Sequence, residues 1–173
     1  MEEKKKNVVL IGMPGAGKST VGVVLAKRLG FQFLDADLLI QEQEGKLLHE
    51  LISDHGQEGF LKIEERVNAG IHAENTVIAT GGSAIYGRDA MVHYKAMGQI
   101  VYLQLTLPSI ALRLGDLSKR GVAMKPGQDL EGLYRERIPL YESYADVTID
   151  CEGKDIREIT EEIAGLFRNR KAP

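Results

Sequence analysis

A glycine-rich segment near the start of the chain has the residue types and the spacing that bind the phosphates of a nucleotide. Residues 12–19 read GMPGAGKS and match the pattern G-x-x-x-x-G-K-[ST]. The glycines let the backbone turn its N–H groups inward, and the helix expected next presents its positive end to the phosphates. Lys18 can reach the β- and γ-phosphates, and the Ser19 hydroxyl suits Mg²⁺. We therefore expect ATP and Mg²⁺ at a loop that includes Gly12, Gly15, Ala16, Gly17, Lys18, Ser19 and Thr20.

Two aspartates follow the second predicted strand. Asp35 and Asp37 lie two residues apart, so both side chains point to one side while strand geometry continues. Open α/β sheets bind ligands at the carboxyl ends of their strands, so both carboxylates should face the phosphate loop. The alternative for Asp37 is a structural role as the cap of the next helix.

Short apolar runs alternate with longer helical patterns along the chain. The predicted strands are residues 7–12, 31–35, 76–79, 99–105 and 147–150. The predicted helices are residues 21–29, 37–74 with breaks at Gly45, Gly56 and Gly59, 88–97, 108–114, 130–144 and 155–167. Strands that alternate with helices imply a parallel sheet covered on both faces. We predict one α/β domain over residues 1–173, with three α/β/α layers around a five-stranded parallel sheet.

A polar, glycine-rich stretch without periodicity covers residues 115–129. A loop of this length inside a compact domain is usually functional or disordered. We expect a mobile lid that closes over the nucleotide and excludes water, as phosphoryl transfer requires. The alternative is a mobile insertion without a catalytic role.

Composition limits the remaining possibilities. The chain has 173 residues, 43% of them hydrophobic and 27% charged, which is ordinary for a folded protein. The formal net charge of −3 argues against broad nucleic-acid binding, and the single cysteine, Cys151, excludes an internal disulfide. No apolar run approaches the roughly 20 residues that span a bilayer. We expect a monomeric cytoplasmic protein whose partner is a small molecule, not a nucleic acid or a membrane.

Further segments complete a pattern that resembles the shikimate kinase family, within the nucleoside-monophosphate-kinase-like P-loop kinases. The resemblance covers the chain from Val8 to about Ile163. In chain order, the matching features are the phosphate loop, the pair Asp35 and Asp37, the turn Gly81-Gly82-Ser83, Arg120 in the polar loop, and a segment from Arg137 to Tyr141 that reads RIPLY.

The resemblance implies catalytic roles for Lys18, Asp37 and Arg120. Ser19 and Asp35 would organise Mg²⁺, with Asp35 acting mainly through water. Asp37 would hold or deprotonate the acceptor hydroxyl. Arg120 would move in with the lid to meet the phosphoryl group in transfer.

The resemblance also implies binding roles. Gly81 and Gly82 would line the acceptor pocket through their backbone, and Arg137 would pair with the substrate carboxylate. Arg113 would lie near the adenine. The ordinary alternatives are a solvated helix-face charge for Arg113, and for Arg137 an ion pair within its helix.

The departures from the family pattern fall mainly in the acceptor half. The family has an arginine directly after the phenylalanine of its Phe-Arg-x-x-Glu segment, where this chain has Leu61. In the family, this arginine helps to hold the substrate carboxylate, so its absence removes a hydrogen bond to a charged group worth about 1.5–3 kcal/mol. The neighbouring Lys62 points about 100° away on a helix. The third glycine of the turn is Ser83, which adds a hydroxyl, and the lid sequence after Arg120 also differs. We expect Leu61 and Ser83 to mark the acceptor pocket.

The sequence thus predicts a kinase that transfers the γ-phosphoryl group of ATP to a hydroxyl of a small carboxylic acid, with shikimate as the leading acceptor and shikimate 3-phosphate as product. A kinase of the same build for another hydroxy acid, such as homoserine, is one alternative. An ATP-binding regulatory protein without transfer activity is another. A small GTPase is disfavoured because the chain has no Asn-Lys-x-Asp element for guanine.

Overall fold

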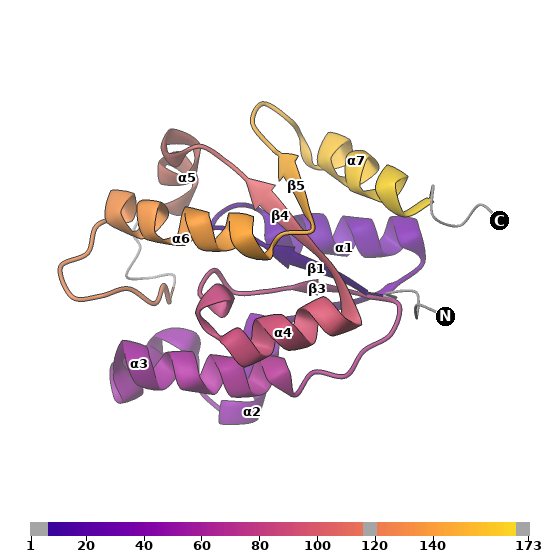
Figure 1. Cartoon of the computed structure of the whole chain (residues 1–173). Coiled ribbons are helices and arrows are strands. Elements are labelled where there is room, and N and C mark those ends of the chain that lie inside the picture. The colour runs from indigo at the N-terminus through magenta and orange to yellow at the C-terminus, as the bar shows by residue number, and fades with distance from the viewer. Residues whose placement is uncertain (1–6, 116–120, 169–173) are drawn as a thin grey trace.

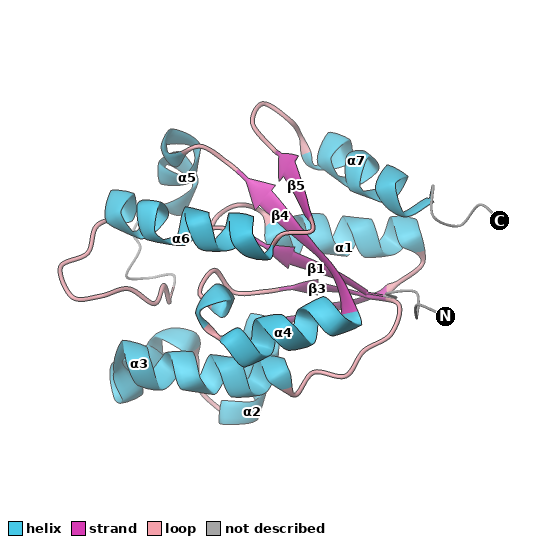
Figure 2. Ribbon diagram, in the orientation of Figure 1, coloured by secondary structure: helices cyan, strands magenta, loops and turns pink. Residues whose placement is uncertain are grey.

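The computed structural model describes residues 7–115 and 121–168. Its centre is a five-stranded sheet in the order β2-β3-β1-β4-β5 (Figure 2). Every pairing is parallel, as predicted. The strands are β1 (Asn7–Ile11), β2 (Gln32–Asp35), β3 (Thr76–Ala79), β4 (Gly98–Gln104) and β5 (Val147–Asp150). The three central strands are almost wholly buried and apolar, as expected when helices cover both faces.

Helices cover both faces of this sheet (Figure 1). The α-helices are α1 (Lys18–Leu29), α2 (Ala36–Glu44), α3 (Leu48–Ala69), α4 (Arg88–Met97), α5 (Leu107–Leu114), α6 (Leu130–Tyr144) and α7 (Ile156–Arg168). Helices α1 and α7 contact each other on one face, and α4 and α6 contact β4 on the other. The pair α2 and α3 lies at the β2 side, where α3 packs on α4. This is the three-layer α/β/α arrangement predicted.

The structure differs from the sequence prediction in three places. The predicted helical stretch 37–74 breaks at Gly45, as predicted, but its second helix ends at Ala69 instead of Glu74. Gly56 kinks α3 with φ 69° and ψ 177°, whereas Gly59 continues the helix. A short 3₁₀ helix, η1 (Ala84–Tyr86), follows the double glycine and was not predicted.

The start of α2 corrects the geometry expected for the two aspartates. Strand β2 ends at Asp35, whose carboxylate caps α2 by accepting from the backbone N–H groups of Asp37 and Leu38. Asp37 therefore lies in the first helical turn and not on a strand. Alternation along a strand does not bring the two together, and the capping role belongs to Asp35.

A small apolar cluster lies apart from the main core. It consists of Ile40, Leu51, Phe60, Val67 and Ala123. Ala123 belongs to the predicted lid, so the described end of that segment packs on α2 and α3. Within the described residues, no helix is long and apolar enough to cross a membrane.

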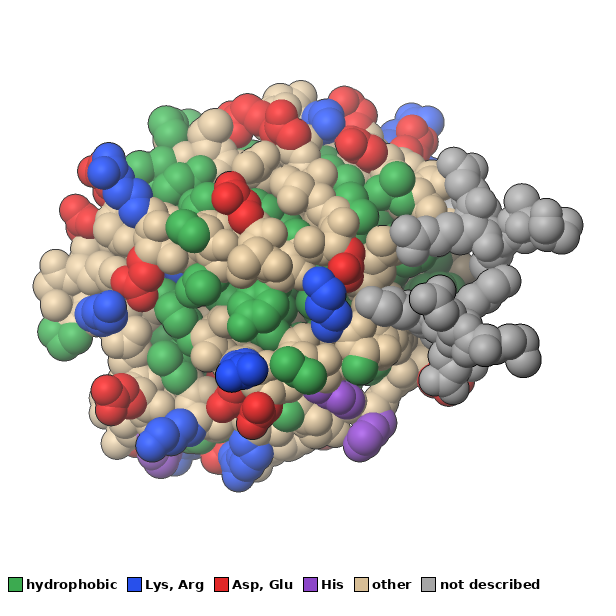
Figure 3. Space-filling model, viewed as in Figure 1, with side chains coloured by type: hydrophobic (Ala, Val, Ile, Leu, Met, Phe, Trp, Pro, Cys, Tyr) green, Lys and Arg blue, Asp and Glu red, His purple; other side chains and the backbone are tan. Residues whose placement is uncertain are grey.

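The face seen in Figure 3 carries Lys, Arg, Asp and Glu side chains that are interspersed over α3, α4 and α6. Exposed ion pairs on the described surface include Lys46 with Asp54 and Arg135 with Glu131. Exposed pairs of this kind add at most about 1 kcal/mol each. The fold therefore depends on its apolar core far more than on surface charge.

Candidate active site

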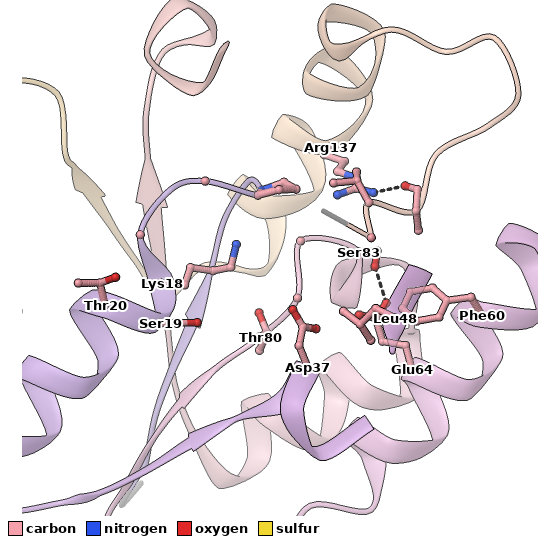
Figure 4. A pocket seen from close by; sticks show the side chains of 18 residues that line it. Lys18, Ser19, Thr20, Asp37, Leu48, Phe60, Glu64, Thr80, Ser83 and Arg137 are labelled. Atoms are coloured by element: carbon pink, nitrogen blue, oxygen red, sulfur yellow. Dashed lines mark hydrogen bonds between the residues drawn. The ribbon is translucent and has the colours of Figure 1, made fainter. Parts of the chain in front are cut away.

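A cavity of about 390 Å³ lies at the carboxyl ends of the strands. The phosphate loop, α2, α3, the double-glycine turn, residues 121–123 and α6 all contribute to its wall. Figure 4 shows Lys18 and Ser19 on one side, Glu64, Ser83 and Arg137 on the other, and Asp37 between them. The cavity therefore joins the predicted nucleotide loop to the predicted acceptor pocket.

The phosphate loop has the backbone that its glycines were expected to allow. Gly12, Gly15 and Gly17 have φ values of 151°, 81° and 92°, a region that side chains disfavour. Lys18 is buried and its Nζ donates to the carbonyls of Gly12 and Met13, at 2.6 and 2.8 Å. Burial lowers the pKa of Lys18 to about 8, against the opposing effect of Asp37. The loop is thus ordered around its own lysine.

Ser19 and Asp35 form an oxygen-rich pair beside this loop. The Ser19 hydroxyl donates to Asp35 Oδ2 at 2.7 Å. Mg²⁺ prefers oxygen ligands and usually combines one or two protein groups with water and substrate phosphates. The oxygens of Ser19 and Asp35 are a donor set that fits Mg²⁺. Thr20 lines the cavity next to Ser19, while Gly12 and Ala16 shape the loop behind it.

Asp37 lies between the two halves of the cavity. Burial and, to a lesser extent, the nearby Asp35 charge raise the pKa of its carboxyl to about 6, against the opposing effect of Lys18. Its Oδ1 lies only 2.6 Å from the place where a Cβ on Gly81 would be. A residue with a side chain at 81 would collide with the carboxylate, so the glycine lets the backbone approach it.

Arg137 forms the far wall with its guanidinium buried. Its Nη2 donates to the carbonyl of Ala123 at 2.5 Å, and its Cζ lies 5.4 Å from the centre of the Tyr86 ring. Its Nε has no hydrogen-bond partner among the described residues. A Cβ on Gly82 would lie 2.9 Å from Arg137 Nη1. This buried cation beside a bare backbone turn is suited to an anion.

Glu64 is a cavity residue that the sequence analysis did not assign to the site. It is 2% exposed, and its Oε1 accepts from the Ser83 hydroxyl at 2.6 Å (Figure 4). Burial raises the pKa of Glu64 to about 7, although the Ser83 hydrogen bond lowers it. The sequence signal for Glu64 was its place as the glutamate of the family's Phe-Arg-x-x-Glu segment, together with Ser83, which replaces the third glycine of the turn.

Five of the predicted site residues that the structure describes are absent from the cavity lining: Gly12, Ala16, Asp35, Leu61 and Arg113. Leu61 packs against the small apolar cluster and is not among the residues that line the cavity. Arg113 is exposed and its Nη1 lies 3.4 Å from the carbonyl oxygen of Gly15, beside the phosphate loop. Arg120 lies outside the described residues. Ser83, Gly81 and Gly82 do line the cavity, as predicted.

Known proteins are similar to this chain in both sequence and fold. The family model described as shikimate kinase matches residues 14–167. A shikimate kinase from Histophilus somni is 35% identical over 97% of this chain and 98% of its own. One from Francisella philomiragia is 39% identical over 93% and 94%.

Solved structures give the same result. A shikimate kinase from Acinetobacter baumannii in complex with shikimate superposes with a TM-score of 0.87 at 31% identity, covering 99% of this chain and 97% of that one. A shikimate kinase from Aquifex aeolicus gives 0.80 at 29% identity, with 95% and 97% covered. A deoxyadenosine kinase from M. mycoides, at 15% identity and a TM-score of 0.59, shares the fold alone.

Proposed function

This chain belongs to the shikimate kinase family, an ATP-dependent phosphotransferase family with an alcohol acceptor, and we propose that it transfers the γ-phosphoryl group of ATP to a hydroxyl of shikimate. The products are ADP and shikimate 3-phosphate. The observation that carries the proposal is one continuous cavity with a phosphate loop at one end, a buried arginine at the other and a carboxylate between them.

The donor half binds ATP through the phosphate loop. Inward backbone N–H groups and the start of α1 hold the phosphates. Lys18 gives up its hydrogen bonds to the loop carbonyls and donates to phosphate oxygens instead. Ser19 and Asp35 hold Mg²⁺, which neutralises charge on the phosphates when bound. Arg120 adds a further positive charge at the phosphate in transfer, carried by the lid of residues 115–129. Arg113 contacts the nucleotide from α5.

The acceptor half positions the hydroxyl. Arg137 pairs with the substrate carboxylate, and the backbone of Gly81 and Gly82 forms the floor beneath the substrate. Asp37 accepts the hydroxyl proton as the oxygen forms its bond to phosphorus and the bond to ADP breaks. Because the transition state of phosphoryl transfer is loose, most of the rate enhancement comes from this positioning and from charge stabilisation.

The test is ADP release by the purified chain with ATP and Mg²⁺ and a panel of acceptors that contains shikimate, homoserine and related hydroxy acids. We expect turnover with shikimate. Turnover of another hydroxy acid without turnover of shikimate would contradict the acceptor and leave the reaction type in place. If the chain bound ATP but turned over none of the acceptors, and if its biological activity survived Asp37→Ala, these two results would contradict an enzymatic function.

A further inference from the structure

The acceptor end of the cavity holds a carboxyl group that the proposed reaction does not use. Glu64 is buried, one of its oxygens accepts from Ser83, and its other oxygen, Oε2, has no hydrogen-bond partner among the described residues. Buried carboxyl oxygens without a donor are costly, because they lose their hydration without replacement. Oε2 therefore needs a donor that the described residues do not supply.

The helix that carries Glu64 supplies no cation to it. Leu61, one turn earlier, packs into the small apolar cluster, and Lys62 is exposed. Ser83 is a neutral donor and satisfies Oε1 only. The charged side chains that act on Glu64 across the cavity are Asp37, Arg137 and Lys18, and the last of these is bonded to the phosphate loop.

Two acidic oxygens converge on one point of the substrate floor. The position of a Cβ on Gly81 lies 2.6 Å from Asp37 Oδ1 and 2.8 Å from Glu64 Oε2. One residue further, the matching position on Gly82 lies 2.9 Å from Arg137 Nη1. Beside the Gly81-Gly82 backbone there are thus two neighbouring hydrogen-bond acceptors, Asp37 and Glu64, and one cation, Arg137. A molecule that spans these three groups has a carboxylate at one end and two donors at the other.

We propose that this pocket also takes hydroxy acids that carry an ammonium group, with Glu64 as the residue that binds the ammonium. The carboxylate of such a substrate pairs with Arg137, its reacting hydroxyl with Asp37, and its ammonium with Glu64 Oε2. Ser83 is a positioning residue that holds Oε1 so that Oε2 faces the cavity. The inference rests on the proposed phosphotransfer and extends its acceptors to amino-hydroxy acids.

Charge balance favours this class over neutral polyols. Among the described residues, the acceptor half contains the carboxyls of Asp37 and Glu64 and the buried cation of Arg137, while the other buried cation of the cavity, Lys18, is bonded to the phosphate loop. A substrate carboxylate adds another negative charge, and an ammonium on the same molecule cancels it. A hydrogen bond to a charged group changes affinity by roughly ten- to a hundredfold.

The experiment compares matched acceptors on the full chain. ADP release with ATP and Mg²⁺ gives kcat/KM for shikimate, for its analogues in which the 4- or 5-hydroxyl is replaced by an amine, and for homoserine. The readout is the ratio of the best amine acceptor to shikimate. Glu64→Gln removes the charge at constant shape, and Leu61→Arg provides Glu64 with a partner three residues away on its own helix. Glu58→Gln is the control, because Glu58 is exposed on the same helix.

We expect both test variants to lower the ratio at least about tenfold and the control to leave it unchanged. Circular dichroism and ATP affinity verify that each variant is folded, and Leu61→Arg keeps Glu64 itself in place. An unchanged ratio in both variants, with shikimate still turned over, overturns the inference and leaves the proposed function standing. Turnover of an amine acceptor without turnover of shikimate supports the inference and contradicts the proposed acceptor. No turnover of any acceptor overturns both.

Discussion

The charge on Asp35 should contribute to the pH at which the enzyme becomes active. Asp37 has a pKa near 6 because it is buried and because Asp35 lies close to it, and Lys18 has a pKa near 8 because it is buried. When both substrates are kept well below their KM values, the rate reports the ionisation of the free enzyme. We therefore expect a bell-shaped profile between about pH 6 and pH 8, with limits that belong to the coupled pair.

The sign of each limb follows from the role of the group. Asp37 must be ionised to accept a proton, so the rate falls as the pH drops below 6 and is about tenfold below its plateau at pH 5. Lys18 must be charged to hold phosphate, so the rate falls again above pH 8.

Asp35→Asn separates these causes. Asparagine caps a helix about as well as aspartate, so α2 keeps its start, while the like charge that raises the pKa of Asp37 is removed. The acid limb should move to lower pH, but by less than the roughly 2 units back to an ordinary aspartate, because burial remains the larger cause. The maximal rate should also fall, since Asp35 helps to hold Mg²⁺.

The assay is a coupled measurement of ADP release from pH 4.5 to 9.5, with Asp54→Asn as the control because Asp54 is exposed and paired with Lys46 on the surface. Phosphate groups also titrate near pH 6. An acid limb at the same pH in the wild type and in Asp35→Asn would assign the titration to the nucleotide and refute the reasoning about Asp37.

Four further substitutions follow from the packing around single residues. Gly82→Ala puts a Cβ 2.7 Å from the phosphate-loop proline and 2.9 Å from Arg137 Nη1, so we expect a loss of about 1–3 kcal/mol in chemical unfolding together with a higher KM for the acceptor. Gly22→Ala in α1 puts a Cβ 2.6 Å from the Phe33 ring and should destabilise the fold in the same assay, whereas Gly165→Ala in α7 meets nothing within 4 Å and should stabilise it by up to about 1 kcal/mol. Arg137→Met should raise the acceptor KM at least about tenfold while calorimetry finds the ATP affinity unchanged; a matching loss of ATP affinity would place the arginine at the nucleotide instead.

The fold was predictable because its signals are local and agree with each other. Apolar strands that alternate with helical patterns gave the parallel five-stranded sheet, and the glycine spacing gave the phosphate loop. The start of α2 was misjudged because a capping aspartate and a strand-end aspartate look alike in sequence, and only the hydrogen bonds to Asp35 distinguish them.

The acceptor pocket was predicted less completely because its groups come from separate elements. The family pattern points to position 61, where this chain has Leu61 in place of an arginine. The residue affected by the missing arginine is Glu64, which lies on α3 and contacts Ser83, a residue distant from it in sequence. Nothing in the spacing of residues 64 and 83 indicates that contact. The contact between Arg137 and Ala123 is similarly long-range and depends on how the end of the polar loop folds back.

The strand order has a consequence for how such an enzyme can change its substrate over evolution. β1 carries the phosphate loop and its direct neighbour β3 carries the Gly81-Gly82 turn, so the rigid sheet holds donor and acceptor floors about one strand spacing, or roughly 4.8 Å, apart. The side walls of the acceptor floor come from α2, α3 and α6, outside the sheet. Mutations in the walls from α3 and α6 can therefore exchange one acceptor for another, while the phosphate loop and Asp37 keep the alignment of phosphorus with its incoming oxygen.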